Sequence, residues 1–129
     1  MRKSDVYERW GDRYNFAVAK TEVEQPNLTM NQSVYVITRI LVQPEHEAAA
    51  RALLLELIEP TRREPGCLQY DLWQSSISPP EFLLVEAWQS EPDLDAHLSS
   101  AHVQEAYIEG GRYLAAPPET RRYQSLTPT

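Results

Sequence analysis

Four neighbouring residues carry side chains that could move protons and hold a flat ligand: Glu86, Trp88, His97 and His102. An imidazole titrates near neutral pH, so either histidine could act as a general acid or base. The Trp88 indole offers a stacking face and an N–H donor, and Glu86, two residues earlier on the same strand face, could orient a donor. We therefore predict that these four residues are catalytic.

The spacing of the two histidines leaves their roles open. His97 and His102 are five positions apart, which is about 140° around a continuous helix, so they share a face only if Ser99 and Ser100 break the helix. Either ring could instead cap a helix or bond a backbone carbonyl. The spacing argues against a metal pair, and no His–Cys cluster has zinc spacing, so we expect no metal.

Glu86 and Trp88 also have structural interpretations. Trp88 could simply belong to the core. Glu86 is more unusual, because a buried carboxylate needs a partner, which Thr38, Arg39 or a histidine could provide. An exposed position near the end of the strand would remove this requirement.

The surrounding sequence predicts the strands that position these residues. The residues at 34–42 are rich in β-branched and aromatic side chains and indicate a strand. Further strands are predicted at 67–73, 81–88 and 120–126. The short loop between the second and third strands implies that they pair antiparallel.

Two helical regions are predicted between the strands. Apolar residues at three- and four-residue spacing indicate a helix at 45–59, which Pro60 should end or kink. Ser90, followed by Pro92 and Asp93, is typical of a capped helix start. That short helix should break near residues 99–100, and a longer helix should follow to about Leu114.

This order predicts an α+β, ferredoxin-like β-α-β-β-α-β fold, with a four-stranded antiparallel sheet and both helices on one face. The first and third strands are apolar on both sides, for example at Val36 and Ile37 and at Leu84 and Val85. The face without helices therefore needs a cover. We expect a homodimer in which two sheets pack face to face around a two-fold axis.

The chain divides at about residue 33. Residues 1–33 show no apolar periodicity beyond one turn yet contain Tyr7, Trp10, Tyr14 and Phe16, so we interpret them as an N-terminal arm before a domain at 34–129. The arm could dock on a neighbouring surface and enlarge the assembly beyond a dimer. It could also be a floppy leader, or Met30 could be the true start.

Composition limits the partners. The 129 residues have a net charge of −7, which repels phosphate backbones, so we expect no nucleic acid partner. No apolar run approaches the roughly 18 residues of a membrane helix, so we expect no membrane partner. The single Cys67 and the charged first residues favour a cytoplasmic location.

Three segments in series resemble the antibiotic biosynthesis monooxygenase (ABM) domain, a dimeric α/β-barrel family that includes quinol monooxygenases. They are REPGCLQYDLW at 63–73, FLLVEAWQS at 82–90 and LDAHLSSAH at 94–102. The resemblance covers about residues 34–126. It implies a cleft between helices and sheet in which O₂ adds to an electron-rich phenol or hydroquinone without metal, flavin or haem.

The resemblance also suggests which residues border the cleft. Thr38, Tyr70, Trp73 and Tyr107 are the candidate substrate-binding residues, although packing is the favoured interpretation of the three aromatic side chains. Haem-degrading relatives would place an asparagine at position 38 and a haem-ligating histidine at position 107. The threonine and tyrosine found here weigh against haem.

We therefore expect a cofactor-independent monooxygenase that oxidises a small hydroquinone or polyphenol with O₂. Two alternatives remain at this stage. The same cleft could serve an isomerase or lyase acting on a small oxygenated metabolite, with a histidine as the base. The protein could also be a non-catalytic dimeric module, ligand-binding or stress-associated, with an evenly apolar cleft.

Overall fold

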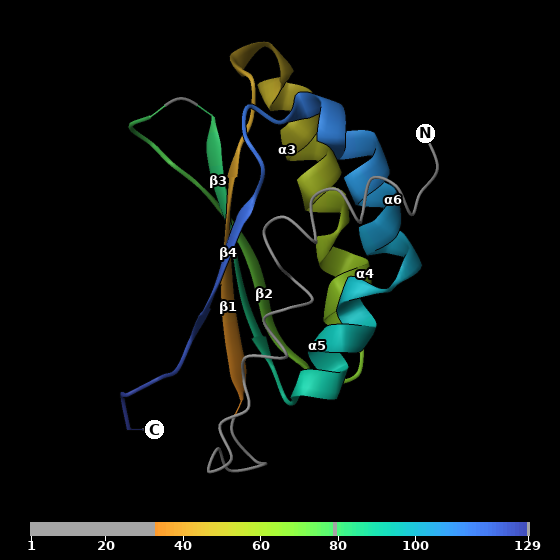
Figure 1. The fold of residues 1–129 in the computed structure, drawn as a ribbon, viewed down its shortest axis with the longest axis vertical. Coiled ribbons are helices and arrows are strands. Elements are labelled where there is room, and N and C mark those ends of the chain that lie inside the picture. Colours follow the sequence, from red (N-terminus) through yellow and green to blue (C-terminus); the bar gives the residue numbers. More distant parts are fainter. Residues whose placement is uncertain (1–32, 79, 129) are drawn as a thin grey trace.

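The computed structural model describes residues 33–78 and 80–128, so all but the last residue of the predicted arm lies outside the described part. Four strands form one antiparallel sheet in the order β2-β3-β1-β4 (Figure 1). Their bounds are Val34–Leu41 for β1, Cys67–Gln74 for β2, Glu81–Trp88 for β3 and Glu119–Tyr123 for β4. The predicted α+β ferredoxin-like fold is confirmed.

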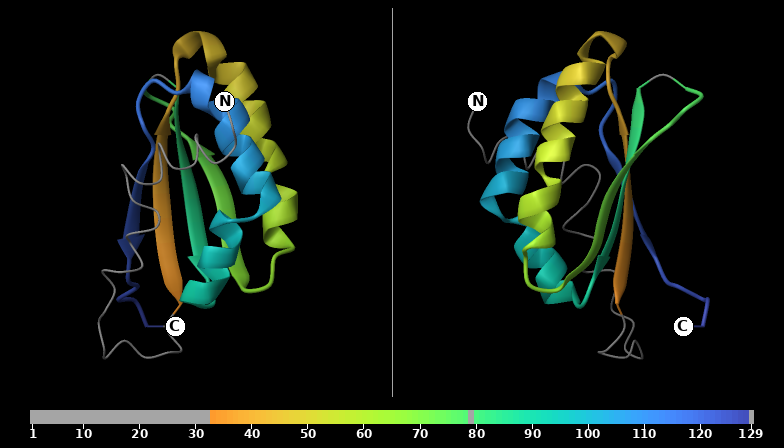
Figure 2. Two further views of the ribbon diagram at one scale, coloured as in Figure 1. Left: turned by 45° about the vertical axis from the view of Figure 1, so that its right-hand side comes forward. Right: turned by 180° about the vertical axis from the view of Figure 1, so that it is seen from behind.

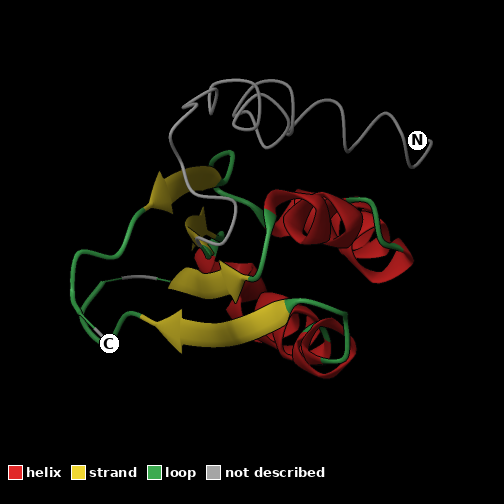
Figure 3. Ribbon diagram, turned by 90° about the horizontal axis from the view of Figure 1, so that it is seen from below, coloured by secondary structure: helices red, strands yellow, loops and turns green. Residues whose placement is uncertain are grey.

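The helices lie together on one face of the sheet (Figures 2 and 3). They are α3 (Glu47–Glu56), α4 (Ile58–Arg62), α5 (Glu91–Leu98) and α6 (Ala101–Gly110), with short 3₁₀ turns η1 (Pro44–His46) and η2 (Gly111–Tyr113). The other face carries no described helix. Among the described residues, no helix is long and apolar enough to cross a bilayer.

The first helical region differs from the prediction in where it bends. The α3 helix ends at Glu56, and α4 starts at Ile58, so the break precedes Pro60. Pro60 then occupies the first turn of α4. Backbone N–H groups in the first turn have no intrahelical acceptor, so proline, which lacks an N–H, costs no hydrogen bond there. The second helical region ends earlier than predicted, because α6 stops at Gly110 and η2 continues to Tyr113.

The predicted start of α5 is confirmed. The Ser90 side chain accepts a hydrogen bond from the Asp93 backbone N–H at 3.3 Å, and its hydroxyl donates to Asp93 Oδ2 at 2.8 Å. Pro92 lies in the first turn. These contacts satisfy helix-terminal N–H groups that would otherwise lack partners, and they fix where α5 leaves the end of β3.

Strand alternation separates two faces of the sheet. On the helix-covered face, Phe82, Leu84, Glu86 and Trp88 of β3 are all buried, and the register places Val36 of β1 opposite Glu86. Trp88 is fully buried. This face and the apolar sides of α3, α5 and α6 form the core.

A glycine turn joins α4 to β2. Gly66 has φ +83°, a backbone conformation that L side chains rarely adopt, and an added Cβ would lie 2.2 Å from the Asp93 carboxylate. The Gln89 backbone N–H donates to the Gly66 carbonyl at 2.8 Å. The turn is therefore held against the end of β3 and the first turn of α5.

Candidate active site

Glu86 is a carboxylate in the middle of an apolar sheet face. It lies opposite Val36 on β1 and Tyr70 on β2, and its side chain is 7% exposed. The Trp88 indole N–H donates to Glu86 Oε1 at 2.9 Å. Burial raises the pKa of Glu86 to about 7, with a further rise from the charge of Glu64, while the hydrogen bond from Trp88 opposes the shift. Glu86 therefore gains or loses a proton near neutral pH.

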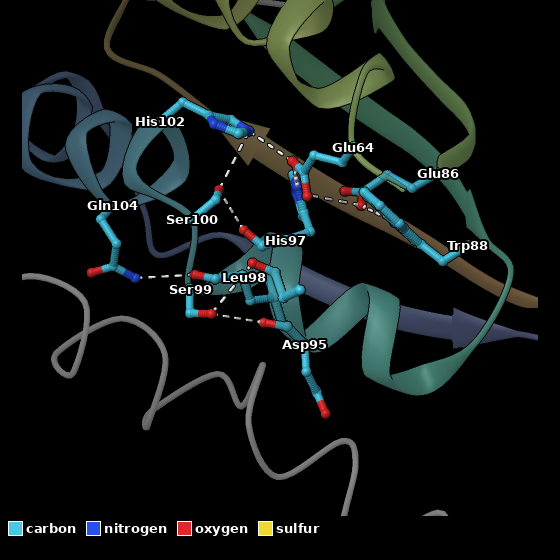
Figure 4. A network of polar contacts seen from close by, with 11 residues as sticks. Glu64, Glu86, Trp88, Asp95, His97, Leu98, Ser99, Ser100, His102 and Gln104 are labelled. Carbon is cyan, nitrogen blue, oxygen red and sulfur yellow. Dashed lines mark hydrogen bonds and ion pairs between the residues drawn. The ribbon is translucent and has the colours of Figure 1, made fainter. Parts of the chain in front are cut away.

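His97 lies in the last turn of α5, above this carboxylate. Its ring packs on Trp88 with centroids 4.6 Å apart and meets Tyr70 edge-on at 5.6 Å. Its Nε2 lies 3.9 Å from Glu86 Oε1, and its Nδ1 lies 2.8 Å from Glu64 Oε2. Figure 4 shows the ring held between the two carboxylates. Aromatic packing and the bond to Glu64 fix its orientation.

The helical path breaks between α5 and α6, directly after Leu98. The Ser99 hydroxyl bonds the Asp95 carbonyl at 3.1 Å, and the Ser100 hydroxyl donates to the His97 carbonyl at 2.7 Å. His102 is therefore the second residue of a new helix, and the 140° separation expected along a continuous helix does not apply. His102 Nε2 lies 2.7 Å from Glu64 Oε2, so both histidines meet one carboxylate oxygen.

Glu64 is the site residue that sequence reasoning missed. It belongs to the Glu-Pro-Gly turn before β2, where its carbonyl accepts a hydrogen bond from the Cys67 N–H at 3.2 Å. Its side chain is 14% exposed and lies between the two histidine rings. The sequence marked this segment as a turn and as part of a family motif, but nothing local indicates that the turn reaches helices more than thirty residues away.

Hydrogen-bond donors determine the histidine tautomers. The single hydroxyl proton of Ser100 goes to the His97 carbonyl, so Ser100 Oγ, 3.3 Å from His102 Nε2, accepts there. His102 therefore carries its proton on Nε2. Glu64 Oε2 also accepts a hydrogen bond from His97 Nδ1–H, which leaves a lone pair on His97 Nε2. Burial lowers the pKa of His97, against the opposing effect of its bond to Glu64, so the ring is neutral near pH 7.

A cavity of about 110 Å³ lies between the sheet and helices α3 and α6. Its walls are mainly aliphatic. The polar side chains among its lining residues are Thr38, Tyr70, Glu86, His97, Tyr107 and Tyr113. Burial raises the pKa of Tyr70 well above its ordinary value, so this residue remains a phenol.

The structure brings together most of the residues singled out in the sequence. Glu86 and His97 line the cavity, as do Thr38, Tyr70 and Tyr107. Trp88 and His102 are not among the lining residues: Trp88 supports Glu86 and His97 from the core, and His102 contacts Glu64 on the far side of His97.

Trp73 lies apart from this group. It is three positions after Tyr70 on the same strand, so strand alternation turns it to the opposite face, where it is 56% exposed and pairs in register with Leu83. It is not among the cavity residues. Because Trp73 lies on the opposite face of the sheet, it does not contact a ligand bound in that cavity.

Comparisons with known proteins agree with the fold. The sequence profile described as "Antibiotic biosynthesis monooxygenase" matches residues 33–107. The chain is 39% identical to Rv0793 of Mycobacterium tuberculosis over 88 residues, covering 68% of this chain and 86% of that protein. The solved structure of Rv0793 superposes with a TM-score of 0.70 at 35% identity, covering 74% of this chain and 97% of that one.

Two further solved structures share the fold. PA3566 from Pseudomonas aeruginosa has a TM-score of 0.71 at 28% identity, covering 76% of this chain and 98% of its own. A crystal structure of an antibiotic biosynthesis monooxygenase has a TM-score of 0.69 at 26% identity, covering 73% of this chain and 99% of its own.

Proposed function

The chain belongs to the antibiotic biosynthesis monooxygenase family, and on that premise we propose that it is a cofactor-independent monooxygenase that oxidises a small hydroquinone or polyphenol with O₂. One observation carries the proposal. A neutral histidine on a cavity wall is held by a carboxylate on Nδ1 and has a free lone pair on Nε2. This is the arrangement of an oriented general base.

In the proposed reaction, His97 Nε2 accepts the phenolic proton of the substrate. The resulting phenolate gives up an electron to O₂ far more readily than the phenol does. The Glu64 carboxylate holds the ring in the reactive tautomer and stabilises the imidazolium that forms. Glu86, with a pKa of about 7, can hold a second hydroxyl group of the substrate as either donor or acceptor.

The size of the cavity limits the substrate to at most one aromatic ring. An apolar cavity of about 150 Å³ holds benzene, and the space here is smaller, about 110 Å³. The mainly aliphatic walls offer water few hydrogen-bond partners, which would protect the radical pair formed by electron transfer. Thr38 and Tyr70 supply hydroxyl groups on the sheet side of the cavity.

The overall chemistry balances without an external reductant. A hydroquinone and O₂ give a hydroxyquinone and water. Electron transfer gives a semiquinone and superoxide, which combine at a ring carbon to form a hydroperoxide. Loss of water from this hydroperoxide leaves one oxygen atom on the ring, so the substrate supplies all the electrons.

Oxygen uptake tests the proposal. With the full chain and a panel of one-ring hydroquinones at neutral pH, we expect at least one substrate to consume O₂ well above its autoxidation rate. With isotopically labelled O₂, one labelled atom should enter the product and the other should leave as water. Release of hydrogen peroxide with no label in the product would contradict monooxygenation.

A second candidate function follows from the Glu86–His97 pair. A carboxyl group with a pKa of about 7 lies 3.9 Å from the free nitrogen of a neutral histidine, so the pair could move a proton between two positions of a carbonyl compound. Such an isomerase would turn over under argon. A monooxygenase would stop, so anaerobic assays with the same compounds separate the two functions.

We also propose that two copies pack sheet against sheet. Tyr35 and Ile37 of β1 and Leu83 and Val85 of β3 face away from the helices and are only half-buried. Trp73 adds an exposed indole to the same face. Exposed apolar side chains gathered on one sheet face favour a cover, which a second copy related by a two-fold axis would supply.

Light scattering coupled to size-exclusion chromatography checks this assembly. The full chain should elute with the mass of a dimer at micromolar concentration, and Val85→Glu should shift it to monomer. Leu55→Glu is the matched control, because Leu55 is a 51% exposed leucine on α3, on the helical side of the protein. A monomeric wild-type chain would exclude the dimer.

A further inference from the structure

Three side-chain atoms that could bind a metal ion lie close together on the side of His97 that faces away from the cavity. They are Glu64 Oε2, His97 Nδ1 and His102 Nε2, all within 4.8 Å of one another, and we name these residues the Glu64–His97–His102 triad. Two of the three separations are already 2.7 and 2.8 Å, both to the carboxylate oxygen. Figure 4 shows the three side chains pointing toward one another from the turn before β2 and from two helices.

We propose that this triad binds one divalent transition-metal ion, with Zn²⁺ as the best fit. Two imidazoles and one carboxylate are a common donor set for zinc, completed by a water molecule as the fourth ligand. Bond lengths near 2.0–2.1 Å in a tetrahedron require donor atoms roughly 3.3 Å apart. The triad reaches this spacing by small side-chain shifts, because the ion replaces the two protons that now lie between the carboxylate and the rings.

A second observation supports the site. A metal-ligating histidine usually directs its other ring nitrogen at a carboxylate or carbonyl group. His97 does so, because its Nε2 faces Glu86 Oε1 at 3.9 Å, and Glu86 is in turn held by the Trp88 N–H. In the described part of the chain, Glu64 and Glu86 form ion pairs with histidines and not with arginine. No guanidinium group therefore competes with a metal ion for either carboxylate.

The ion reaches the triad without passing through the cavity. The His102 side chain is 26% exposed and the Glu64 side chain 14%, whereas the His97 side chain is 4% exposed. Neither Glu64 nor His102 lines the cavity. The metal site and the proposed substrate site therefore lie on opposite nitrogens of one imidazole.

Sharing that ring couples the two sites. A neutral histidine that binds a metal through Nδ1 must carry its proton on Nε2. Metal binding therefore converts the cavity-facing nitrogen of His97 from an acceptor to a donor, and the base of the proposed reaction is lost. This regulatory consequence rests on the proposed function, whereas binding of the ion does not.

Titration of the chelator-treated full chain with ZnCl₂ tests the binding. Calorimetry should show one equivalent bound by the wild type, and Glu64→Gln and His102→Gln should each weaken binding by about 100-fold or more. Glu86→Gln, which changes only the outer partner, should weaken it by about 10-fold. His46→Gln is the matched control, because His46 stacks on Tyr113 away from the triad. Equal binding by the wild type and both triad variants would overturn the site.

Long-range ¹H–¹⁵N spectra of the imidazole rings test the coupling. The chain has three histidines, so each ring can be followed separately. Zn²⁺ should move the His97 proton from Nδ1 to Nε2 and the His102 proton from Nε2 to Nδ1, while His46 stays unchanged. If the His97 proton stays on Nδ1 in the zinc-loaded chain, Nδ1 is not a ligand and the proposal is wrong.

An activity assay then separates the two proposals. One equivalent of Zn²⁺ should stop oxygen uptake by the wild type, and a chelator should restore it. The same Zn²⁺ concentration should leave the rate of His102→Gln where it was before the addition. If zinc binds at the triad yet does not change the rate, the regulatory coupling is wrong. If no substrate supports uptake, the proposed function fails while the binding and tautomer results stand.

Discussion

Replacing His97 with glutamine should lower the catalytic rate constant for oxygen uptake by about 10²- to 10⁴-fold, the range expected for loss of a general base. Glutamine fills similar space and keeps an amide that can bond Glu64, but it cannot accept the substrate proton. The binding of substrate should change little, because the cavity walls remain. Steady-state kinetics with the best hydroquinone of the panel measure both quantities.

The pH dependence gives this prediction a second readout. Only neutral His97 can act as a base, and burial holds its pKa below the ordinary imidazole value. The wild-type rate should therefore fall as pH drops through that lowered pKa. The residual rate of His97→Gln should not show this fall at low pH. His46→Gln controls for the loss of a histidine outside the cavity. A His97→Gln rate within about threefold of the wild type would rule His97 out as the base.

Replacing Glu86 with glutamine should make the folded protein more stable, by an amount that grows as pH rises from 4.5 to about 7 and stays constant above that range. The folded-state pKa is raised from 4.5 to about 7, so the folded protein holds this proton after the unfolded chain has lost it. Between these values Glu86 destabilises the wild type progressively, by about 3 kcal/mol once pH exceeds 7. The glutamine side chain stays neutral, and its amide oxygen can still accept the Trp88 N–H.

Urea unfolding of both proteins from about pH 4.5 to about pH 8 checks this difference. His97 acts in the opposite direction, since its lowered pKa means that stability is lost as pH falls below 6.5. The Glu86→Gln comparison should therefore be repeated in the His97→Gln background, which removes that contribution. A stability difference that does not vary with pH in either background would mean that Glu86 titrates as a solvated carboxylate.

The fold could be predicted largely from local patterns. A β-branched and aromatic run marked the first strand, turns and loops bounded the next two, and Ser90 with Asp93 marked the start of α5 because capping is a local contact. Helix ends were less accurate. The break before Pro60 and the stop at Gly110 depend on how the helices pack on the sheet, which local sequence patterns do not show.

The candidate site was predicted unevenly, for a related reason. Glu86 and His97 were noticed because a carboxylate on an apolar strand and a histidine near a helix break are unusual in themselves. Glu64 was missed because its importance comes from contacts with residues 33 and 38 positions later. Trp73 was placed with Tyr70 although three positions along a strand always separate faces, a conflict that the register makes visible.

The Gly66 turn has a consequence for anyone who redesigns this protein. Because an added Cβ there would collide with Asp93, the loop that carries Glu64 and the start of α5 are mutually dependent, although Gly66 and Asp93 are far apart along the chain. Lengthening this loop, or replacing it with the loop of a relative, would move the Glu64 carboxylate away from His97 and His102 unless the start of α5 were replaced at the same time. The loop and the first turn of α5 should therefore be exchanged together.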